Sequence, residues 1–584
     1  MKAFLKIFFA SFLALAIFSF ISVIIAVWII GKAAQPEKPD IGSNGVLVLD
    51  LTVNFKEQGQ DNPIASVLSD ASETPGLHEV VRVIEYAKKD SAIKGIYIKA
   101  SGNSNGFAAS EELRKALIDF KQSKKFVIAY GEAMSQKAYY VATAADKIYC
   151  HPNGGVDWVG FSTQLYFIKG LLDKLEIQPQ IFYAGKFKSA TEPFRVTQMT
   201  EPNRLQTTVW LGDLYSSFLT ATSQARGIDT AQLHALANNG SIQFAADAVK
   251  YHLVDGVKYD DEVKKELFGL INQKESDKLN FVMLNKYVKA VDTKMNEGKD
   301  RIAVIYAEGD IVSGKGSDDE IGSDTYKNLI RKARFDKDIK AIVFRVNSPG
   351  GSALASDVIW REITLAKKEK PVVVSMGNYA ASGGYYISCA GDSIFADPST
   401  ITGSIGVFSI IANTQGFFKN KLGITFDGVK TGPYADMMTS DRPLTETEKR
   451  FLQSDVDTIY HTFKSRVAEG RKKSIEYIDS IAQGRVWTGQ RAIEVGLVDR
   501  IGTLQDAIAA AARMAKTRDY KVKEYPEKKT FLEQIMGGSA NKSIKTKAVK
   551  EEIGEDEYNM LQQMKQIKSW IGAPMTRLPF EAKM

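Results

Sequence analysis

The chain has 584 residues, of which 44% are hydrophobic and 25% are charged, a composition typical of a globular protein with more than one domain. Its net charge of +7 is spread along the chain without a basic block, which argues against a nucleic-acid-binding protein. Two cysteines and five scattered histidines exclude a disulfide framework and offer no clustered metal ligands, so we expect neither a metal nor a cofactor.

Residues 1–33 predict a transmembrane anchor. Residues 7–31 carry no charged side chain, and 25 residues in a helix can cross a hydrocarbon core of about 30 Å. This run is longer than the apolar core of a cleaved secretion signal, so an uncleaved anchor is favoured over a cleaved signal. The short amino-terminal flank favours an N-terminus in the cytoplasm, with the remainder of the chain outside it.

The chain contains an internal duplication. The segment AYYVATAADKIY around Tyr139 matches GYYISCAGDSIF around Tyr385, 246 positions later. The match of Leu253 to Leu497 has an offset of 244, so the spacing is nearly constant over a long stretch, which chance matches do not produce. We therefore predict a first repeat unit at 46–278, a linker at 280–299, a second unit at 300–527 and a charged tail at 528–584 with a helix near 551–568.

Both units show the same alternation of short apolar runs and helical patterns. Strands are expected at 46–51, 95–99, 179–183, 302–306, 341–346 and 371–375, and helices at 77–88, 111–120, 205–225, 326–335, 355–367 and 446–469. Strands that alternate with helices of this length predict an α/β fold, with mostly parallel sheets and crossover helices.

Residues 371–390, PVVVSMGNYAASGGYYISCA, are the most informative stretch. An apolar strand is followed by a turn of small residues at 380–384 and by a helix that begins near Tyr385. Ser382 lies in that turn, where nucleophilic serines are often placed because small neighbours let a substrate backbone approach closely. The alternative is that Ser382 only caps the helix, since serine is a common N-cap residue.

The two copies differ at the residues that carry chemistry. In the second copy Asn347 begins the sequence NSPGG, whose paired glycines leave backbone N–H groups free to act as an oxyanion hole. The aligned stretch of the first copy, 101–105, reads SGNSN, and Gln136 lies opposite Ser382. The first copy therefore lacks this nucleophile. Because it lacks the serine and the paired glycines together, a functional role for the two motifs of the second copy is favoured over that of plain turns.

A serine nucleophile needs a base, and no histidine lies in a recognisable motif. The segment YAGKFKSATEPF, which starts at Tyr183, offers a lysine instead. Lys188 lies opposite Ala435 of the second copy, so the lysine occurs only where the serine does not. The local pattern does not decide between Lys186 and Lys188, and most lysines are simply solvated charges.

Four motifs in order, GKFKSATEPF, NSPGGS, GNYAASGGYYIS and TGSIGVF, resemble the signal peptide peptidase A family in its long two-repeat form, also called the protease IV family. The resemblance covers essentially the whole chain and implies a fold similar to Clp protease and the crotonases. It implies that Ser382 is the nucleophile, Lys188 the general base and Ser404 the residue that holds the lysine. It also implies that Gly351 and Gly383 supply the oxyanion N–H groups.

The same resemblance implies how the protein is used. We expect a single-pass protein of the bacterial inner membrane, with the catalytic part on the periplasmic side, that degrades cleaved signal peptides and other hydrophobic peptides. We also expect a homo-oligomer, a tetramer shaped like a bowl over the membrane lipid. Two alternatives remain open: a crotonase-like acyl-CoA enzyme, which would use the glycine turn but not Ser382 or Lys188, and a non-catalytic membrane scaffold.

Overall fold

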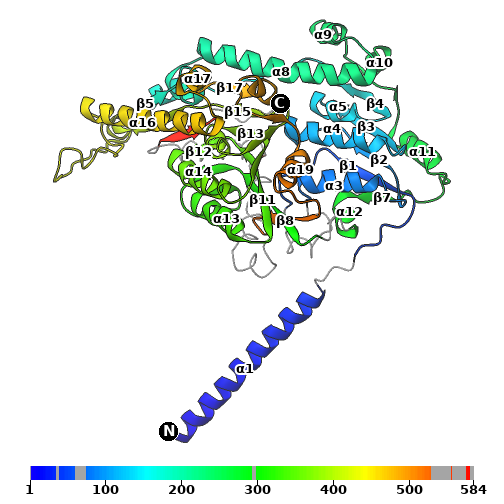
Figure 1. Cartoon of the computed structure of the whole chain (residues 1–584), viewed down its shortest axis with the longest axis horizontal. Coiled ribbons are helices and arrows are strands. Elements are labelled where there is room, and N and C mark those ends of the chain that lie inside the picture. Colours follow the sequence, from blue (N-terminus) through cyan, green and yellow to red (C-terminus); the bar gives the residue numbers. More distant parts are fainter. Residues whose placement is uncertain are drawn as a thin grey trace.

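The computed structural model describes residues 2–33, 38–59, 74–291, 298–527, 554 and 574–578. The first helix, α1 (Lys2–Ala33), extends away from the rest of the molecule (Figure 1). Within these described residues, the structure contains no helix long and apolar enough to span a bilayer. The helix predicted near 551–568 lies outside the described residues, apart from residue 554.

The first unit is built on a parallel sheet with the strand order β6-β4-β3-β2-β1-β7. Apolar side chains on one face pack against α3 and α4, and those on the other face pack against α11. Because helices cover both faces of the sheet, side chains on both sides of each strand are buried, and the strand sequences are nearly continuous apolar runs. The strands are β1 (Gly45–Asp50), β2 (Ile93–Lys99), β3 (Phe126–Met134), β4 (Lys147–Val156), β6 (Gly256–Val257) and β7 (Phe281–Met283), and the main helices are α3 (Leu77–Ala87), α4 (Phe107–Lys121), α5 (Gln136–Ala142), α8 (Glu201–Arg226) and α11 (Asp260–Leu270).

The predicted linker at 280–299 is not only a connection. Its first residues form β7, which pairs with β1 in parallel, Leu47 opposite Val282. The helix α12 (Leu284–Ala290) follows and buries Tyr287. The sheet of the first unit therefore extends beyond residue 278, because the apolar run FVM supplies one more strand.

The second unit repeats this plan, which confirms the predicted α/β fold with mostly parallel sheets. Its sheet has the order β17-β15-β13-β11-β8-β19, and β14 and β18 extend it beside β13. Helix α19 covers one face, while α13 and α14 lie on the other side (Figure 1). The strands are β8 (Asp300–Glu308), β11 (Ile339–Ser348), β13 (Val372–Ala381), β14 (Ser393–Ala396), β15 (Ile401–Gly403), β17 (Val486–Thr488), β18 (Arg500–Ile501) and β19 (Tyr520–Tyr525), and the main helices are α13 (Ser323–Phe335), α14 (Ala353–Lys367), α15 (Gly383–Ser388), α16 (Glu446–Arg471) and α19 (Leu504–Met514).

A third sheet joins strands from both units and was not predicted. Its order is β10-β9-β12-β20-β16-β5. Strand β5, from the first unit, pairs antiparallel with β16 of the second unit over seven residue pairs, from Val407–Ala184 to Asn413–Gln178. The strands are β5 (Gln178–Ala184), β9 (Asp310–Val312), β10 (Glu320–Gly322), β12 (Gly350–Ser352), β16 (Val407–Asn413) and β20 (Met575–Arg577).

A buried ion network also fixes the two units against each other. Arg345 on β11 donates to Glu57 and Glu112 of the first unit, each at 2.7 Å. The three side chains are 1–3% exposed. Because an unpaired charge at such depth is strongly unfavourable, this network specifies how the two units meet.

Candidate active site

Ser382 lies at a sharp turn between β13 and α15. Its backbone has φ 55° and ψ −114°, a conformation rarely adopted by residues other than glycine, and its N–H donates to the Gly403 carbonyl at 2.7 Å. The predicted small-residue turn begins later than expected, since Ala380 and Ala381 still belong to β13 and pair with β15. The Ser382 side chain makes no capping hydrogen bond to α15, so the capping alternative is wrong.

Lys188 follows β5 on a tightly held loop. Its backbone N–H donates to the Gly185 carbonyl at 3.0 Å, and the preceding Phe187 N–H donates to the Gln483 carbonyl at 2.7 Å. Gln206 on α8 clamps the same loop, since its Nε2 donates to the Phe187 carbonyl at 3.1 Å while its Oε1 accepts from Val486 N–H at 3.1 Å. Both units therefore hold the loop in place.

The loop brings Lys188 to Ser382 within one chain. The Lys188 Nζ lies 2.8 Å from Ser382 Oγ, although 194 residues separate them in sequence. It also lies 3.2 Å from both the carbonyl oxygen and the Oγ of Ser404. The side chains of Lys188, Ser382 and Ser404 are all buried.

The surroundings of Lys188 disfavour a charged amine. Burial lowers the pKa of Lys188 well below its usual value. None of the ion pairs within the described residues involves Lys188, so no carboxylate offsets this effect. Lys188 Nζ is placed to donate to Ser382 Oγ and to the carbonyl oxygen and Oγ of Ser404. In its neutral form the amine has two N–H donors, which suffice for Ser404, and one lone pair that can take the proton of the Ser382 hydroxyl.

The other candidates from the sequence lie elsewhere. Lys186 is exposed, and its Nζ lies 6.0 Å from the centre of the Phe187 ring. Gln136, the counterpart of Ser382, binds the backbone of its own unit: it donates to the Gly160 carbonyl at 2.9 Å and accepts from Gly160 N–H at 3.0 Å. The first copy thus uses this position to hold a loop.

The glycines predicted to form the oxyanion hole lie side by side next to Ser382. A β-carbon placed on Gly383 would be 3.1 Å from the backbone nitrogen of Gly351. One placed on Gly350, which has φ +107°, would be 2.8 Å from the backbone nitrogen of Gly383 and 2.0 Å from the Thr576 carbonyl oxygen. Only glycine fits at positions 350 and 383, because a side chain would collide with neighbouring atoms. The backbone nitrogens of Gly351 and Gly383 and the Thr576 carbonyl oxygen therefore lie close together.

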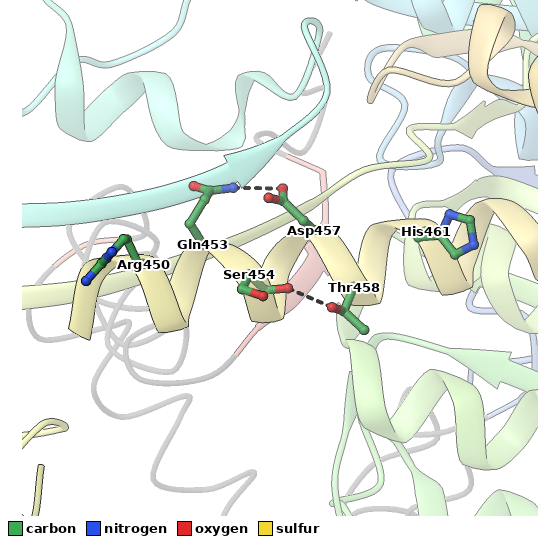
Figure 2. Close-up of a pocket in the computed structure, with 6 residues that line it drawn as sticks. All are labelled: Arg450, Gln453, Ser454, Asp457, Thr458 and His461. Atoms are coloured by element: carbon green, nitrogen blue, oxygen red, sulfur yellow. Dashed lines mark hydrogen bonds between the residues drawn. The ribbon is translucent and has the colours of Figure 1, made fainter. Parts of the chain in front are cut away.

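The hollow on α16 does not contain this chemistry. It has a volume of about 510 Å³ and is lined by Arg450, Gln453, Ser454, Asp457, Thr458 and His461 (Figure 2). These polar side chains lie along one side of a single helix, where Gln453 donates to Asp457 at 2.9 Å. None of Lys188, Ser382 and Ser404 lines it.

Comparison with known proteins places this arrangement in a family. The family model described as "Peptidase family S49" matches residues 119–274 and again 364–518, and the model "Clp protease" matches residues 293–400. The chain is 37% identical over 527 residues to "Protease 4" of Salmonella typhi, covering 88% of this chain and 85% of the relative. The chain belongs to peptidase family S49. As an S49 peptidase it is a serine peptidase, and its two family matches correspond to the two repeat units.

Two further relatives of this S49 peptidase cover most of its length. "Protease 4" of Haemophilus influenzae is 34% identical and spans 81% of this chain and 79% of its own. "Serine protease SPPA, chloroplastic" of Arabidopsis thaliana is 33% identical and spans 85% of this chain and 74% of its own. Among solved structures, a ClpP1 from Listeria monocytogenes covers 35% of this chain and 94% of its own, at 16% identity and a TM-score of 0.24.

Sequence reasoning missed two parts of the site in this S49 peptidase. Gln206, which joins the lysine loop to β17, gave no signal because a single glutamine in a long helix has no distinctive pattern. The strand around Thr576 was also missed, since it lies in a tail whose composition only indicated charge. Both act through contacts with residues far away in the sequence.

Proposed function

We propose that this S49 peptidase is an endopeptidase that uses Ser382 as nucleophile and Lys188 as general base. The observation that carries the proposal is the 2.8 Å separation of Lys188 Nζ and Ser382 Oγ at a buried site where burial lowers the lysine pKa. A base within hydrogen-bond reach is the first requirement for activating a serine, and a lowered pKa is the second.

The reaction follows from this geometry. Ser382 Oγ attacks the peptide carbonyl while its proton passes to the neutral Lys188 amine. The backbone N–H groups of Gly351 and Gly383 stabilise the oxyanion of the tetrahedral intermediate. Lys188 then gives its proton to the leaving amine, and water, deprotonated by the same lysine, hydrolyses the acyl-enzyme. Ser404 keeps the amine oriented through its Oγ and carbonyl without adding a charge.

The proposed substrates are hydrophobic peptides at a membrane, cleaved signal peptides among them. The uncharged run at 7–31 supports an anchor in the bacterial inner membrane, and the described apolar side chains of α1 are exposed to solvent, such as Phe4, Phe12 and Phe18. The catalytic part would face the periplasm as a homo-oligomer. Proteolysis of spheroplasts should therefore digest most of the chain, and full protection until lysis would contradict this topology.

A serine-reactive phosphonate probe tests the catalytic part of the proposal. The detergent-solubilised full chain should be labelled at Ser382 and lose activity against hydrophobic peptides, whereas Ser382→Ala should not be labelled. The matched control is Lys186→Ala, which should be labelled at the normal rate. A crotonase-like acyl-CoA enzyme, which does not need a reactive serine, would escape labelling altogether.

A further inference from the structure

A buried carboxylate close to Lys188 in the sequence takes no part in the proposed mechanism. Glu192 follows Lys188 by four residues and is 2% exposed. Its oxygens accept hydrogen bonds from the Thr200 N–H at 3.2 Å, from the Thr200 hydroxyl at 2.5 Å and from Nδ2 of Asn203 at 2.8 Å. Its ion pair with Arg195 is longer, at 3.7 Å. Because a buried charge is unfavourable unless it is hydrogen-bonded, these donors fix where the carboxylate lies.

Two buried amides link Glu192 to the lysine loop. Asn203 is fully buried on α8, and its Oδ1 accepts a hydrogen bond from Nε2 of Gln206 at 3.3 Å. The same nitrogen of Gln206 lies 3.1 Å from the Phe187 carbonyl and 3.1 Å from Ser189 Oγ, and these two residues flank the lysine. The series Glu192, Asn203 and Gln206, which we call the amide relay, therefore ends on both neighbours of the proposed base.

The carboxylate decides which way each amide of the relay faces. An ionised carboxylate only accepts hydrogen bonds, so Asn203 must present its nitrogen to Glu192 and its oxygen to Gln206. Gln206 must then present its nitrogen to Asn203 and to the lysine loop, which leaves its oxygen to accept from the Val486 N–H at 3.1 Å. An amide turned the other way would place two acceptors against each other and leave a buried donor without a partner, which is strongly unfavourable.

The far end of the relay reaches the residue that holds the lysine. Val486 follows Arg485, whose carbonyl accepts a hydrogen bond from the Ser404 N–H at 2.7 Å. Ser404 in turn lies 3.2 Å from Lys188 Nζ through both its Oγ and its carbonyl oxygen. One side chain, that of Gln206, therefore fixes both the loop that supplies the amine and the segment that holds the partner of the amine.

The equivalent positions of the described helix α16 do not form such a relay. Helices α8 and α16 each have 26 residues, and α16 begins 245 positions after α8, so they are equivalent in the duplication. Phe451 lies opposite Gln206 and is 47% exposed. Glu448 lies opposite Asn203 and instead caps its own helix. The relay thus occurs in the copy that carries the lysine and not in the copy that carries the serine.

We propose that the amide relay positions the Lys188 amine between Ser382 and Ser404 and keeps water away from it. This inference rests on the proposed function, because it takes Lys188 to be the general base. The relay residues act through the loop and not on the substrate. Burial lowers the pKa of Lys188, so a loosened loop that admits water should raise that pKa towards its ordinary value. Four titratable side chains lie around the loop and stay unchanged in the variants below: Lys186, Arg195, Tyr460 and Arg485.

The first test compares two variants of α8 in the full chain, with an uncharged apolar peptide as substrate. Gln206→Leu should lower kcat roughly 10- to 100-fold with KM unchanged, because a displaced base slows the chemical step and not binding. The acid limb of its kcat/KM profile should move to higher pH, so the deficit should shrink as the pH rises. The matched control Asp213→Leu removes another contact between α8 and the second unit, the ion pair with Arg491 at 2.6 Å, and should leave the limb in place even where it lowers the Tm.

The second test changes the relay at the end that does not contact the loop. Glu192→Met removes the acceptor that orients Asn203, so the acid limb should move as it does in Gln206→Leu. Glu192→Gln should behave nearly as the parent, because its amide oxygen can still accept from Asn203 while its nitrogen donates to the Thr200 hydroxyl. An acid limb at the same pH in the parent, Gln206→Leu and Glu192→Met would overturn the inference.

Labelling with the serine-reactive phosphonate separates this inference from the proposed function. Gln206→Leu should be labelled more slowly than the parent at neutral pH and at nearly the parent rate at high pH. A parent chain that is not labelled at all would contradict the proposed function and the relay with it. A labelled parent, with Gln206→Leu labelled at the parent rate at every pH, would contradict the relay alone.

Discussion

Ala184 of the first unit pairs with Val407 of the second unit, and this pairing determines where Lys188 lies. Lys188 follows Ala184 by four residues, after a turn at Gly185 whose φ is +110°. A β-carbon on Gly185 would lie 2.7 Å from the Gln483 backbone, so the turn fits only because glycine has no side chain. The strand pairing and this turn together place the Lys188 amine beside Ser382.

Loss of either member of the pair should abolish peptide cleavage. Ser382→Ala removes the nucleophile, and Lys188→Ala removes a base whose contribution is of the order of 10²–10⁴-fold in rate. The double variant should be no slower than the slower single variant, since the two residues act as one unit. Rates of cleavage of an apolar fluorogenic peptide measure this effect, and Lys186→Ala, on the same loop but exposed, should retain the parent rate.

Activity should depend on pH through Lys188. Burial lowers the lysine pKa, and the amine must be neutral to accept the serine proton, so kcat/KM should fall as the pH drops through that lowered pKa. At higher pH the rate should reach a plateau. A pH profile between pH 5 and 10 checks this, and an unchanged rate across that whole range would contradict a lysine base.

Lys188→Met should stabilise the protein at neutral pH while it removes activity. The native state keeps Lys188 unprotonated above its lowered pKa, whereas the unfolded chain binds that proton up to about pH 10.4, so the parent protein becomes more stable as the pH rises between these limits. A buried methionine of similar shape carries no such penalty. Thermal unfolding should show a higher Tm for Lys188→Met at pH 7, and the difference should shrink towards pH 10.

Arg345→Leu should destabilise the contact between the two units. The substitution would leave Glu57 and Glu112 buried without their cation, and breaking a buried pair in this way costs about 3–5 kcal/mol. Chemical denaturation should show this loss. Lys327→Leu, which removes an exposed pair with Asp324, is the control and should change the stability by less than about 1 kcal/mol. Equal effects of the two substitutions would argue against a structural role for the network.

The sequence determined the elements and the chemistry of the separate motifs. The positions of β1, β8 and β11, and of α3, α13 and α14, agree with the predicted ones within a few residues, because apolar periodicity is a local property. The duplication is confirmed by the two matches to one family model. The small residues around Ser382 and the paired glycines after Asn347 were also visible, because a sharp turn requires particular residues at particular positions.

Only the tertiary structure decided which of these groups meet. Lys186 and Lys188 are indistinguishable by local pattern, and the difference between them is that one amine is exposed while the other is buried beside Ser382. The third sheet, the clamp of Gln206 and the strand around Thr576 all depend on pairings between residues that are far apart in the chain. Edge strands accept any extended partner through the same backbone groups, so the sequence of a strand alone does not say which partner it will take.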